Sequence, residues 1–274
     1  MRNWTHSVAL LLVLGVAQLQ GQEWARPVIP AGVLFNLETG WISSGATCPA
    51  RTHQWTLQSD LSSHTDEGSG GVSLDEKGGA ALPTHLGAGN GYRGAGSDGM
   101  DTNSTSETLV PNLAEEWTFC TAGDFDGAAI DDDVWGVSTT STPTIVINAS
   151  AANGIQLLIT DNTSGVLDVD GGSISSSTFT MFCVAISGND AAGTEIWQDG
   201  SYQTVNTNTD TWDDNLPTLA EIHAADINSA ATEGWDGDWL FFAVWDGDKL
   251  TDDEIDACCS DVFQSVTTAT LTCN

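Results

Sequence analysis

The chain has 274 residues, 40% of them hydrophobic, which is enough for a packed core and argues against overall disorder. It has 38 acidic and 6 basic residues, and the formal net charge of -32 repels phosphate backbones and anionic membrane surfaces. Nucleic acid is therefore a poor partner. Most of this dispersed acid is expected to be solvated surface that keeps the protein soluble.

The N-terminus has the organisation of a secretory signal. The segment MRNWTHS carries one arginine, VALLLVLGVA is an apolar run, and QLQGQ is polar, so cleavage is expected after Ala17 or Gly21. The apolar run is too short to span a bilayer, and no second one follows. We expect residues 1–21 to be a signal peptide, residues 22–46 an N-terminal extension, and the mature protein to be secreted or at the cell surface, not integral to a membrane. A membrane anchor or a buried helix is the alternative for the apolar run.

The rest of the sequence predicts strands. Between Thr47 and Asp101 the chain is rich in Gly, Ser and Asp, which favours short strands and long turns. From Glu116 onward, β-rich runs recur between Gly, Asn or Asp turn residues: EWTFCTA, TPTIVINAS, GIQLLITD, GVLDVDG, FTMFCVAIS, TEIWQDG and WLFFAVWDG. This pattern predicts an all-β sandwich or barrel. Only TDDEIDACCSDVF predicts a helix, with Thr251 as its cap and Glu254 at the reciprocal capping position.

Six cysteines in an exported chain predict disulfides. They are Cys48, Cys120, Cys183, Cys258, Cys259 and Cys273, and none lies in a CxxC or Cys/His spacing that suits zinc. Spacing alone does not select their pairing. A reactive thiol at Cys183 is the alternative, but no histidine lies near it in the sequence to act as a base.

Three blocks, in this order and spacing, resemble the LamG-like, concanavalin A-like jelly rolls, and in particular the pentraxin branch. EWTFCTAGDFD is similar to an early inner strand of the form aromatic-Thr-x-Cys. FCVAISGNDAAGTEIWQDGSY is similar to a strand, a Gly turn and a strand ending in W-x-D-G, and GWDGDWLFFAVWDGDKLTDDEIDA is similar to the closing strand and short helix. The resemblance covers Glu116 to Cys259. It implies a two-sheet antiparallel jelly-roll sandwich over residues 47–267 with one short C-terminal helix, and a C-terminal tail over residues 268–274.

The resemblance also implies a disulfide. In pentraxins the matching strands are neighbours joined by their cysteines, so Cys120 and Cys183 are the implied partners. Such a bond stabilises a fold by a few kcal/mol. The other four cysteines would tie the N-terminal segment and the tail to the helix, and the pairing among them stays open.

A weak calcium site is the metal prediction. In pentraxins, oxygen ligands from two loops converge on calcium, and the matching positions here are Asn153, Glu233 and the pair Asp226 and Asn228. The family's Glu-Gln-Asp cluster is missing from this stretch, so we expect fewer charged ligands and weak binding. The acidic run over residues 123–133 has its glycine too early for an EF-hand loop and is interpreted as a solvated loop.

Eleven tryptophans raise the question of sugar stacking. Four fall inside predicted strands and are expected in the core: Trp117, Trp197, Trp239 and Trp245. Trp135, Trp212 and Trp235 lie among Asp and Gly in predicted loops, where an indole beside carboxylates could bind a sugar. Packing is the preferred interpretation of these three, and ligand binding is the alternative.

No catalytic motif is found. Retaining glycosidases of this fold carry E-x-D-x-x-E on one strand, and the nearest match, Glu254-Ile255-Asp256, has Cys259 at the third position and lies in the predicted helix. No G-x-S-x-G occurs, and the histidines show no ligand spacing; they are His6, His53, His64, His85 and His223. We therefore expect the protein not to be an enzyme.

The sequence thus predicts an exported, non-catalytic carbohydrate-binding or adhesion-type domain. A glycan or cell-surface polysaccharide is the expected partner, and homo-oligomers are compatible with it. The alternative is a structural or assembly protein of a cell surface or virion that uses the jelly roll for self-association.

Overall fold

The computed structural model describes residues 45–57, 63–76, 84–95, 99–102, 116–124, 132–138, 143–150, 154–161, 163–174, 179–187, 191–212, 221–224, 235–268, 270–271 and 273. Contacts divide the chain into two units, Met1–Gly45 and Ala46–Asn274, and the elements described below belong to the second unit. The predicted signal peptide and almost all of the predicted extension lie outside the described residues. Within the described part of the chain, no helix is both long and apolar enough to cross a membrane.

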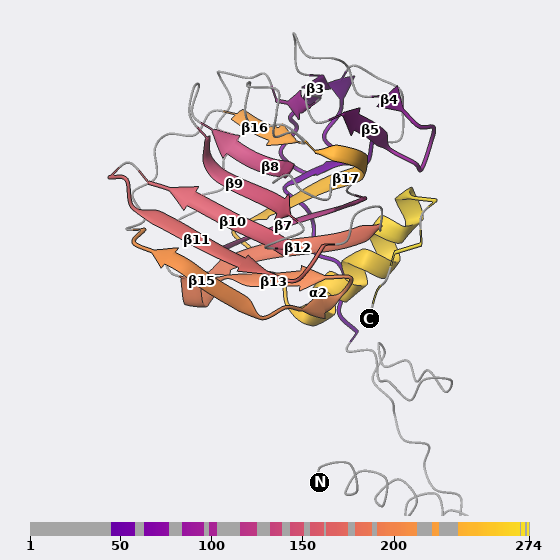
Figure 1. Cartoon of the computed structure of the whole chain (residues 1–274). Helices are drawn as coiled ribbons and strands as arrows, with labels where there is room; N and C mark the ends of the chain where they lie inside the picture. Colours follow the sequence, from indigo (N-terminus) through magenta and orange to yellow (C-terminus); the bar gives the residue numbers. More distant parts are fainter. Residues whose placement is uncertain are drawn as a thin grey trace, which may run out of the picture. The chain divides into compact units, whose positions relative to one another are not determined.

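Two antiparallel sheets form the second unit (Figure 1). Among the described residues, the eight-stranded sheet has the order β14 (Ser201–Tyr202), β13 (Glu195–Gln198), β12 (Thr180–Ser187), β7 (Glu116–Gly123), β17 (Asp236–Asp246), β5 (Tyr92–Ala95) and β4 (Thr84–His85), with β1 (His53–Trp55) paired to β17. The nine-stranded sheet has the order β15 (Val205–Asp210), β11 (Val166–Gly171), β10 (Gly154–Thr160), β9 (Pro143–Ser150), β8 (Asp132–Ser138), β16 (Glu221–Ala224), β6 (Met100–Asp101), β3 (Leu74–Glu76) and β2 (Ser63–His64). The predicted all-β, two-sheet antiparallel sandwich is confirmed.

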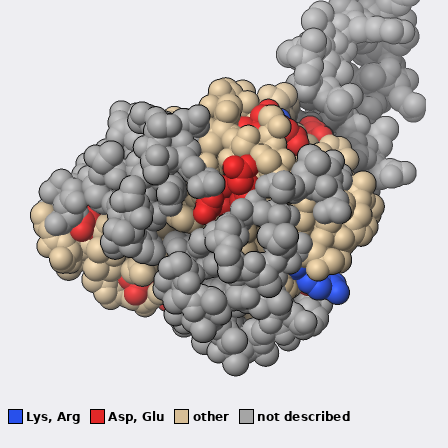
Figure 2. Space-filling model, turned by 90° about the horizontal axis from the view of Figure 1, so that it is seen from above, with Lys and Arg blue, Asp and Glu red and all other residues tan. Residues whose placement is uncertain are grey.

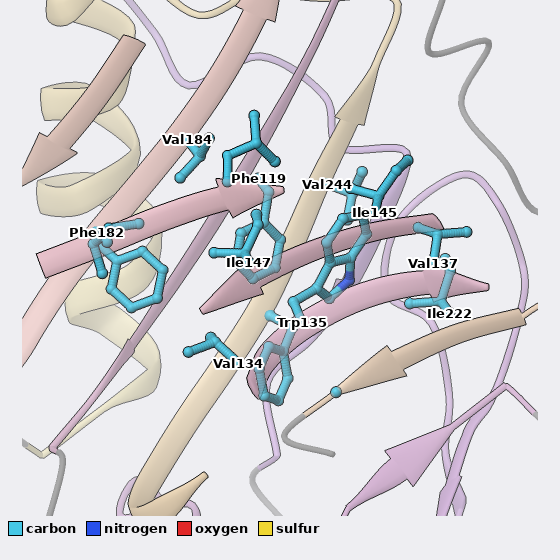
Figure 3. Packing of buried hydrophobic residues seen from close by; sticks show 14 of the residues in the cluster. Phe119, Val134, Trp135, Val137, Ile145, Ile147, Phe182, Val184, Ile222 and Val244 are labelled. Carbon is cyan, nitrogen blue, oxygen red and sulfur yellow. The ribbon is translucent and has the colours of Figure 1, made fainter. Parts of the chain in front are cut away.

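The main core lies between the two sheets, and strand periodicity explains which side chains enter it. On β10, Ile155 and Leu157 are fully buried, whereas Gln156 between them is partly exposed. Successive side chains of a strand point to opposite faces, so one face of the sheet packs inward and the other does not. Figure 3 shows the core, in which the rings of Phe119 from β7 and Trp135 from β8 stack with 4.8 Å between their centroids.

A second buried cluster covers the outer face of the eight-stranded sheet. The covering segment consists of α2 (Asp252–Ala257), the π-helix η2 (Cys258–Phe263) and the 3-10 turn η3 (Gln264–Val266), and a further 3-10 turn, η1 (Ala191–Gly193), precedes β13. The ring of Phe263 stacks on Phe241 of β17, with 4.0 Å between the centroids. Strands β7, β12 and β17 are therefore buried on both faces, which explains their nearly continuous apolar sequences.

The C-terminal helix begins where the sequence predicts it. The Glu254 carboxylate accepts hydrogen bonds from the backbone N–H of Thr251 at 2.9 Å and from its hydroxyl at 2.8 Å. These contacts fix the chain at the point where the first turn leaves backbone donors without intrahelical partners. The predicted short helix and its capping residues are confirmed.

Three disulfides fasten this helix and the sheet beneath it. Cys120 of β7 is bonded to Cys183 of β12, and the two are direct partners in the strand register. The other bonds join Cys48 to Cys258 and Cys259 to Cys273. The pairing implied by the resemblance is therefore present. The remaining bonds tie the segment before β1 and the end of the chain to the same helix.

Replacing Cys120 and Cys183 together by alanine will lower the free energy of unfolding by about 4 kcal/mol, because their bond restricts the unfolded chain over a separation of 63 residues. The same change at Cys259 and Cys273, which lie 14 residues apart, will cost about 3 kcal/mol. Denaturant titrations followed by tryptophan fluorescence measure both losses. A loss for the second pair that equals or exceeds the first would contradict this ranking.

Candidate functional site

One sheet face carries solvent-accessible polar side chains. The C-terminal helix covers the outer face of the eight-stranded sheet, whereas the outer face of the nine-stranded sheet is partly exposed on β9, β10, β11 and β15. We call the outer surface of these four strands the open face. The polar side chains at its centre are Asn148, Gln156, Asp168, Asp170, Asn206 and Asn208.

Hydrogen bonds join five of these side chains into an amide–carboxylate network, comprising Gln156, Asp168, Asp170, Asn206 and Asn208. The Gln156 amide donates to Asp168 at 2.7 Å, and the Asn206 amide donates to Asp170 at 2.9 Å. The Asn208 amide bridges the two carboxylates, at 3.2 Å to Asp168 and 2.8 Å to Asp170. No Lys or Arg occurs on β9, β10, β11 or β15. Amide groups, not cations, therefore hold both carboxylates.

Strand register explains why these residues meet. Asn148 of β9 lies opposite Gln156 of β10. Gln156 in turn lies opposite Asp170 of β11, which lies opposite Asn206 of β15. Directly opposed residues share a face, with Cβ atoms about 4.5–5.5 Å apart. Asn148 Oδ1 is buried and has no hydrogen-bond partner among the described residues, so this row ends on an unused acceptor.

The same sheet brings two carboxylates and an imidazole together near its other edge. Asp75 of β3 lies opposite Asp101 of β6, and Asp101 lies opposite His223 of β16. The preceding residues Leu74 and Met100 enter the core, so Asp75 and Asp101 face outward. His223 is 5% exposed, and Asp75 Oδ1 is buried without a hydrogen-bond partner in the described part of the chain. We call these three residues the acid–imidazole row, because carboxylates and imidazole are the usual groups of acid–base catalysis.

One register line connects the acid–imidazole row to the network. His223 lies opposite Gly136 of β8, which lies opposite Val146 of β9. Val146 lies opposite Leu158 of β10, and Leu158 lies opposite Asp168. Both groups therefore lie on the same side of the sheet. Two partly buried aliphatic side chains and a glycine separate them, which gives a polar, apolar and again polar strip.

Carboxylates dominate the exposed charge. Among the described residues, Figure 2 shows acidic side chains at several places on the face drawn and basic side chains at its lower right. The net charge of -32 has the same sign as the network, so anionic ligands are repelled over long range at low salt.

A third polar group has a structural role. Asp66 is buried and pairs with His53 Nδ1 at 2.7 Å, while its Oδ1 accepts hydrogen bonds from the backbone N–H groups of Gln54 and Gly68. Burial raises the pKa of the Asp66 carboxyl, but the hydrogen bonds from His53 and the two N–H groups outweigh it and hold the pKa below its ordinary value of 3.8. A Cβ at Gly70 would lie 2.0 Å from the His53 ring, so only glycine fits there. The pair is thus enclosed by the chain around β1.

The three tryptophans proposed as ligand-binding candidates are core residues in the structure. Trp135 and Trp235 are 0% exposed, and Trp212 is 6% exposed. The indole N–H of Trp235 donates to the backbone carbonyl of Asp124 at 2.6 Å. A sugar-stacking ring must offer one face to solvent, so the ligand-binding alternative is corrected and the packing interpretation holds. Trp117, Trp197, Trp239 and Trp245 are buried as expected.

All four predicted calcium ligands lie outside the described residues: Asn153, Asp226, Asn228 and Glu233. Among the residues that are described, no group of three or more His, Cys, Asp or Glu side chains could hold a metal ion. Calcium binding therefore stays a prediction.

Comparison with solved structures shows a shared fold. No family model and no curated protein matches the sequence. The chain is similar to Trypanosoma rangeli sialidase in complex with 2,3-difluorosialic acid (TM-score 0.60, 11% identity, covering 87% of this chain and 37% of that one) and to Trypanosoma rangeli sialidase alone (0.57, 13%, 96% and 39%). It is also similar to the binding domain of Botulinum neurotoxin DC in complex with SialylT (0.54, 9%, 80% and 52%). The chain spans less than half the length of these sialidases. At this identity the likeness is one of fold, and the pentraxin branch stays a prediction.

The expectation that the chain is not an enzyme is corrected by this comparison, because solved chains that share its fold include sialidases, which are glycoside hydrolases. The E-x-D-x-x-E motif requires two carboxylates along one strand. In the structure, Asp75 and Asp101 lie opposite each other on two different strands. Because strand pairing brings them together, no fixed spacing in the sequence marks the pair.

The sequence reasoning also missed the amide–carboxylate network. Its signal is the alternation in GIQLLITD and GVLDVDG, which points Gln156, Asp168 and Asp170 to one face of their strands. Alternation does not say which strands pair, so the contact with Asn206 and Asn208 has no counterpart in the sequence pattern.

The Asp66→Asn variant will lose about 2–3 kcal/mol of unfolding free energy at neutral pH, because charged hydrogen bonds to a buried carboxylate are lost. The pKa of Asp66 is lowered in the folded state, so its stabilisation is present above the unfolded pKa and is lost as pH falls through the folded value. The gap between wild type and variant should therefore narrow below about pH 4. Denaturant titrations at neutral pH and at pH 3 measure it, and a gap that widens in acid would contradict the assignment.

Proposed function

We propose that the chain is an exported glycan-binding domain and that the open face is its binding surface. The observation that carries this proposal is the amide–carboxylate network, whose side chains are partly or fully exposed on one sheet face. Sugars bind through hydrogen bonds to their hydroxyl groups, and Asp, Asn and Gln side chains suit that purpose. The network fixes these side chains before a ligand arrives, so less conformational entropy is lost on binding.

The apolar side chains beside the network also suit the binding of a sugar. Val146 and Leu158 lie between the network and the acid–imidazole row on the same face. A pyranose ring has hydroxyl edges and apolar C–H faces, and binding sites pair apolar contact with a few placed polar groups. The polar, apolar and polar order of the strip matches that character.

The fold and the disulfides support the same proposal. The neurotoxin binding domain that shares this fold is solved in complex with SialylT. Three disulfides persist in oxidising compartments, which supports export. The alternative, a structural or assembly protein, predicts a defined oligomer without sugar binding.

Glycan arrays test this function. Wild-type protein should bind a defined subset of glycans, and the double variant Gln156→Ala plus Asn206→Ala should lose about tenfold or more in affinity, because two amides of the network are removed. The matched control is Gln203→Ala, whose amide donates to the nearby Ser201 carbonyl. Light scattering on the same samples gives the oligomeric state. A stable oligomer that binds no glycan would support the assembly function instead.

A second candidate function is glycoside hydrolysis at the acid–imidazole row. The directly opposed carboxylates of Asp75 and Asp101 favour it, because cross-strand Cβ atoms lie about 4.5–5.5 Å apart. Retaining glycosidases hold their two carboxyl groups about 5–5.5 Å apart, one as nucleophile and one as acid and base. His223 beside Asp101 would position that carboxylate.

If this row is catalytic, purified protein will release reducing sugar from a panel of aryl glycosides and polysaccharides. Asp75→Asn and Asp101→Asn will then each lower kcat by about 100-fold to 10,000-fold, since each removes a proton-transfer or nucleophilic group. Asp253→Asn, on the exposed side of α2, is the control of equal charge change. Turnover that survives both substitutions, or its absence in wild type, would remove this candidate.

Calcium is the remaining prediction. If Asn153, Asp226, Asn228 and Glu233 bind the ion, the Kd should be about 10⁻⁴ to 10⁻³ M, as in extracellular modules. At ten times Kd, calcium would add about 1.4 kcal/mol of stability and raise the melting temperature by a few degrees. Magnesium at equal ionic strength controls for screening. Equal shifts from both ions, or an unchanged response in Asp226→Ala plus Glu233→Ala, would show that these residues form no calcium site.

A further inference from the structure

We infer that the open face takes an uncharged, hydroxyl-rich glycan and rejects sialylated and other anionic ones. This inference rests on the proposed glycan-binding function and adds the chemical class of the ligand. It follows from the direction of the hydrogen bonds in the network and from the charges around it. The solved complexes of similar fold contain a difluorosialic acid and SialylT, so the inferred preference differs from those ligands.

The amides of the network use N–H donors on the two carboxylates. A carboxylate can only accept hydrogen bonds, so each amide that contacts one must turn its nitrogen toward it. Gln156 and Asn206 each direct their amide nitrogen to an aspartate, and Asn208 directs its nitrogen to both. The amide orientation is thereby fixed by the chemistry of the partner.

The same contacts leave more acceptors than donors for a ligand. Each amide nitrogen carries two N–H groups, so Gln156 and Asn206 have one donor each besides the one that contacts a carboxylate, whereas the carbonyl oxygens of all three amides are acceptors. The surface therefore offers mainly oxygen acceptors, and its ligand must supply donors. Sugar hydroxyl groups are donors, whereas an ionised carboxylate or sulfate is not.

The charge of the open face also disfavours anionic glycans. The network contains two carboxylates, Asp168 and Asp170, and no Lys or Arg occurs on the four strands of the open face. An anionic glycan would meet two fixed charges of its own sign without a cation to pair with, and like charges across an interface suppress the wrong partner. The net charge of -32 adds a long-range term that salt screens.

Matched pairs of neutral oligosaccharides and their sialylated forms test the inference, measured on an array and then by calorimetry at low and high salt. Wild type should bind neutral members and bind their sialylated forms about tenfold or more weakly at low salt. The variant Asp168→Asn plus Asp170→Asn should lose most of that discrimination. The control Asp253→Asn plus Asp261→Asn changes net charge equally on the C-terminal helix and should keep it. Circular dichroism verifies the fold of each variant.

The outcomes separate this inference from the function on which it rests. Glycan binding in which sialylated members bind as well as or better than neutral ones would overturn the inference and leave the proposed function standing. Equal loss of discrimination in both double variants would assign the selectivity to net charge and not to the open face, which also overturns it. Absence of binding to every member would overturn the glycan-binding function and the inference with it.

Discussion

Burial of β7, β12 and β17 on both faces is the constraint on which the rest of the structure depends. The inner face of these strands packs into the main core, and their outer face is covered by the C-terminal helix. Two disulfides anchor that helix, and the indole N–H of Trp197 on β13 donates a hydrogen bond to Asp252 at its start. A covered face cannot receive a large ligand. The open face of the nine-stranded sheet, in contrast, carries partly or fully exposed polar side chains in the described part of the chain.

Much of the fold could be predicted because its long strands carry strong patterns. β7, β12 and β17 are apolar runs bounded by turn residues, and the helix has a capping pair at Thr251 and Glu254. The strands between residues 63 and 101 are only two to four residues long. So short a segment does not show a period of two, and its assignment depends on pairing partners far away in the sequence. The pairing of Cys120 with Cys183 came from the family resemblance, since spacing does not select it.

The site could be predicted less well, because the pairing of strands that are distant in the sequence brings its residues together. Asp75, Asp101 and His223 lie on three strands that are separate in the sequence, and only their pairing brings them into one row. The sequence around the tryptophans gave a wrong indication of exposure for a related reason. Asp and Gly around Trp135 and Trp235 indicate exposed loops, yet polar neighbours at a strand end do not determine where an indole points. A large ring adjacent to the core gains more by burial than by exposure.

The amide–carboxylate network also explains how an acidic chain can keep two carboxylates close together on one face. Asp168 and Asp170 are two residues apart on β11 and point to the same side, so their charges repel. Amide dipoles from three neighbouring side chains stabilise both charges in place of a cation. Dipoles add no net charge, so the face remains negative toward distant ions. At contact distance, however, the same amides have neutral oxygen acceptors, and under the proposed glycan-binding function this combination would favour ligands rich in donors over anionic ones.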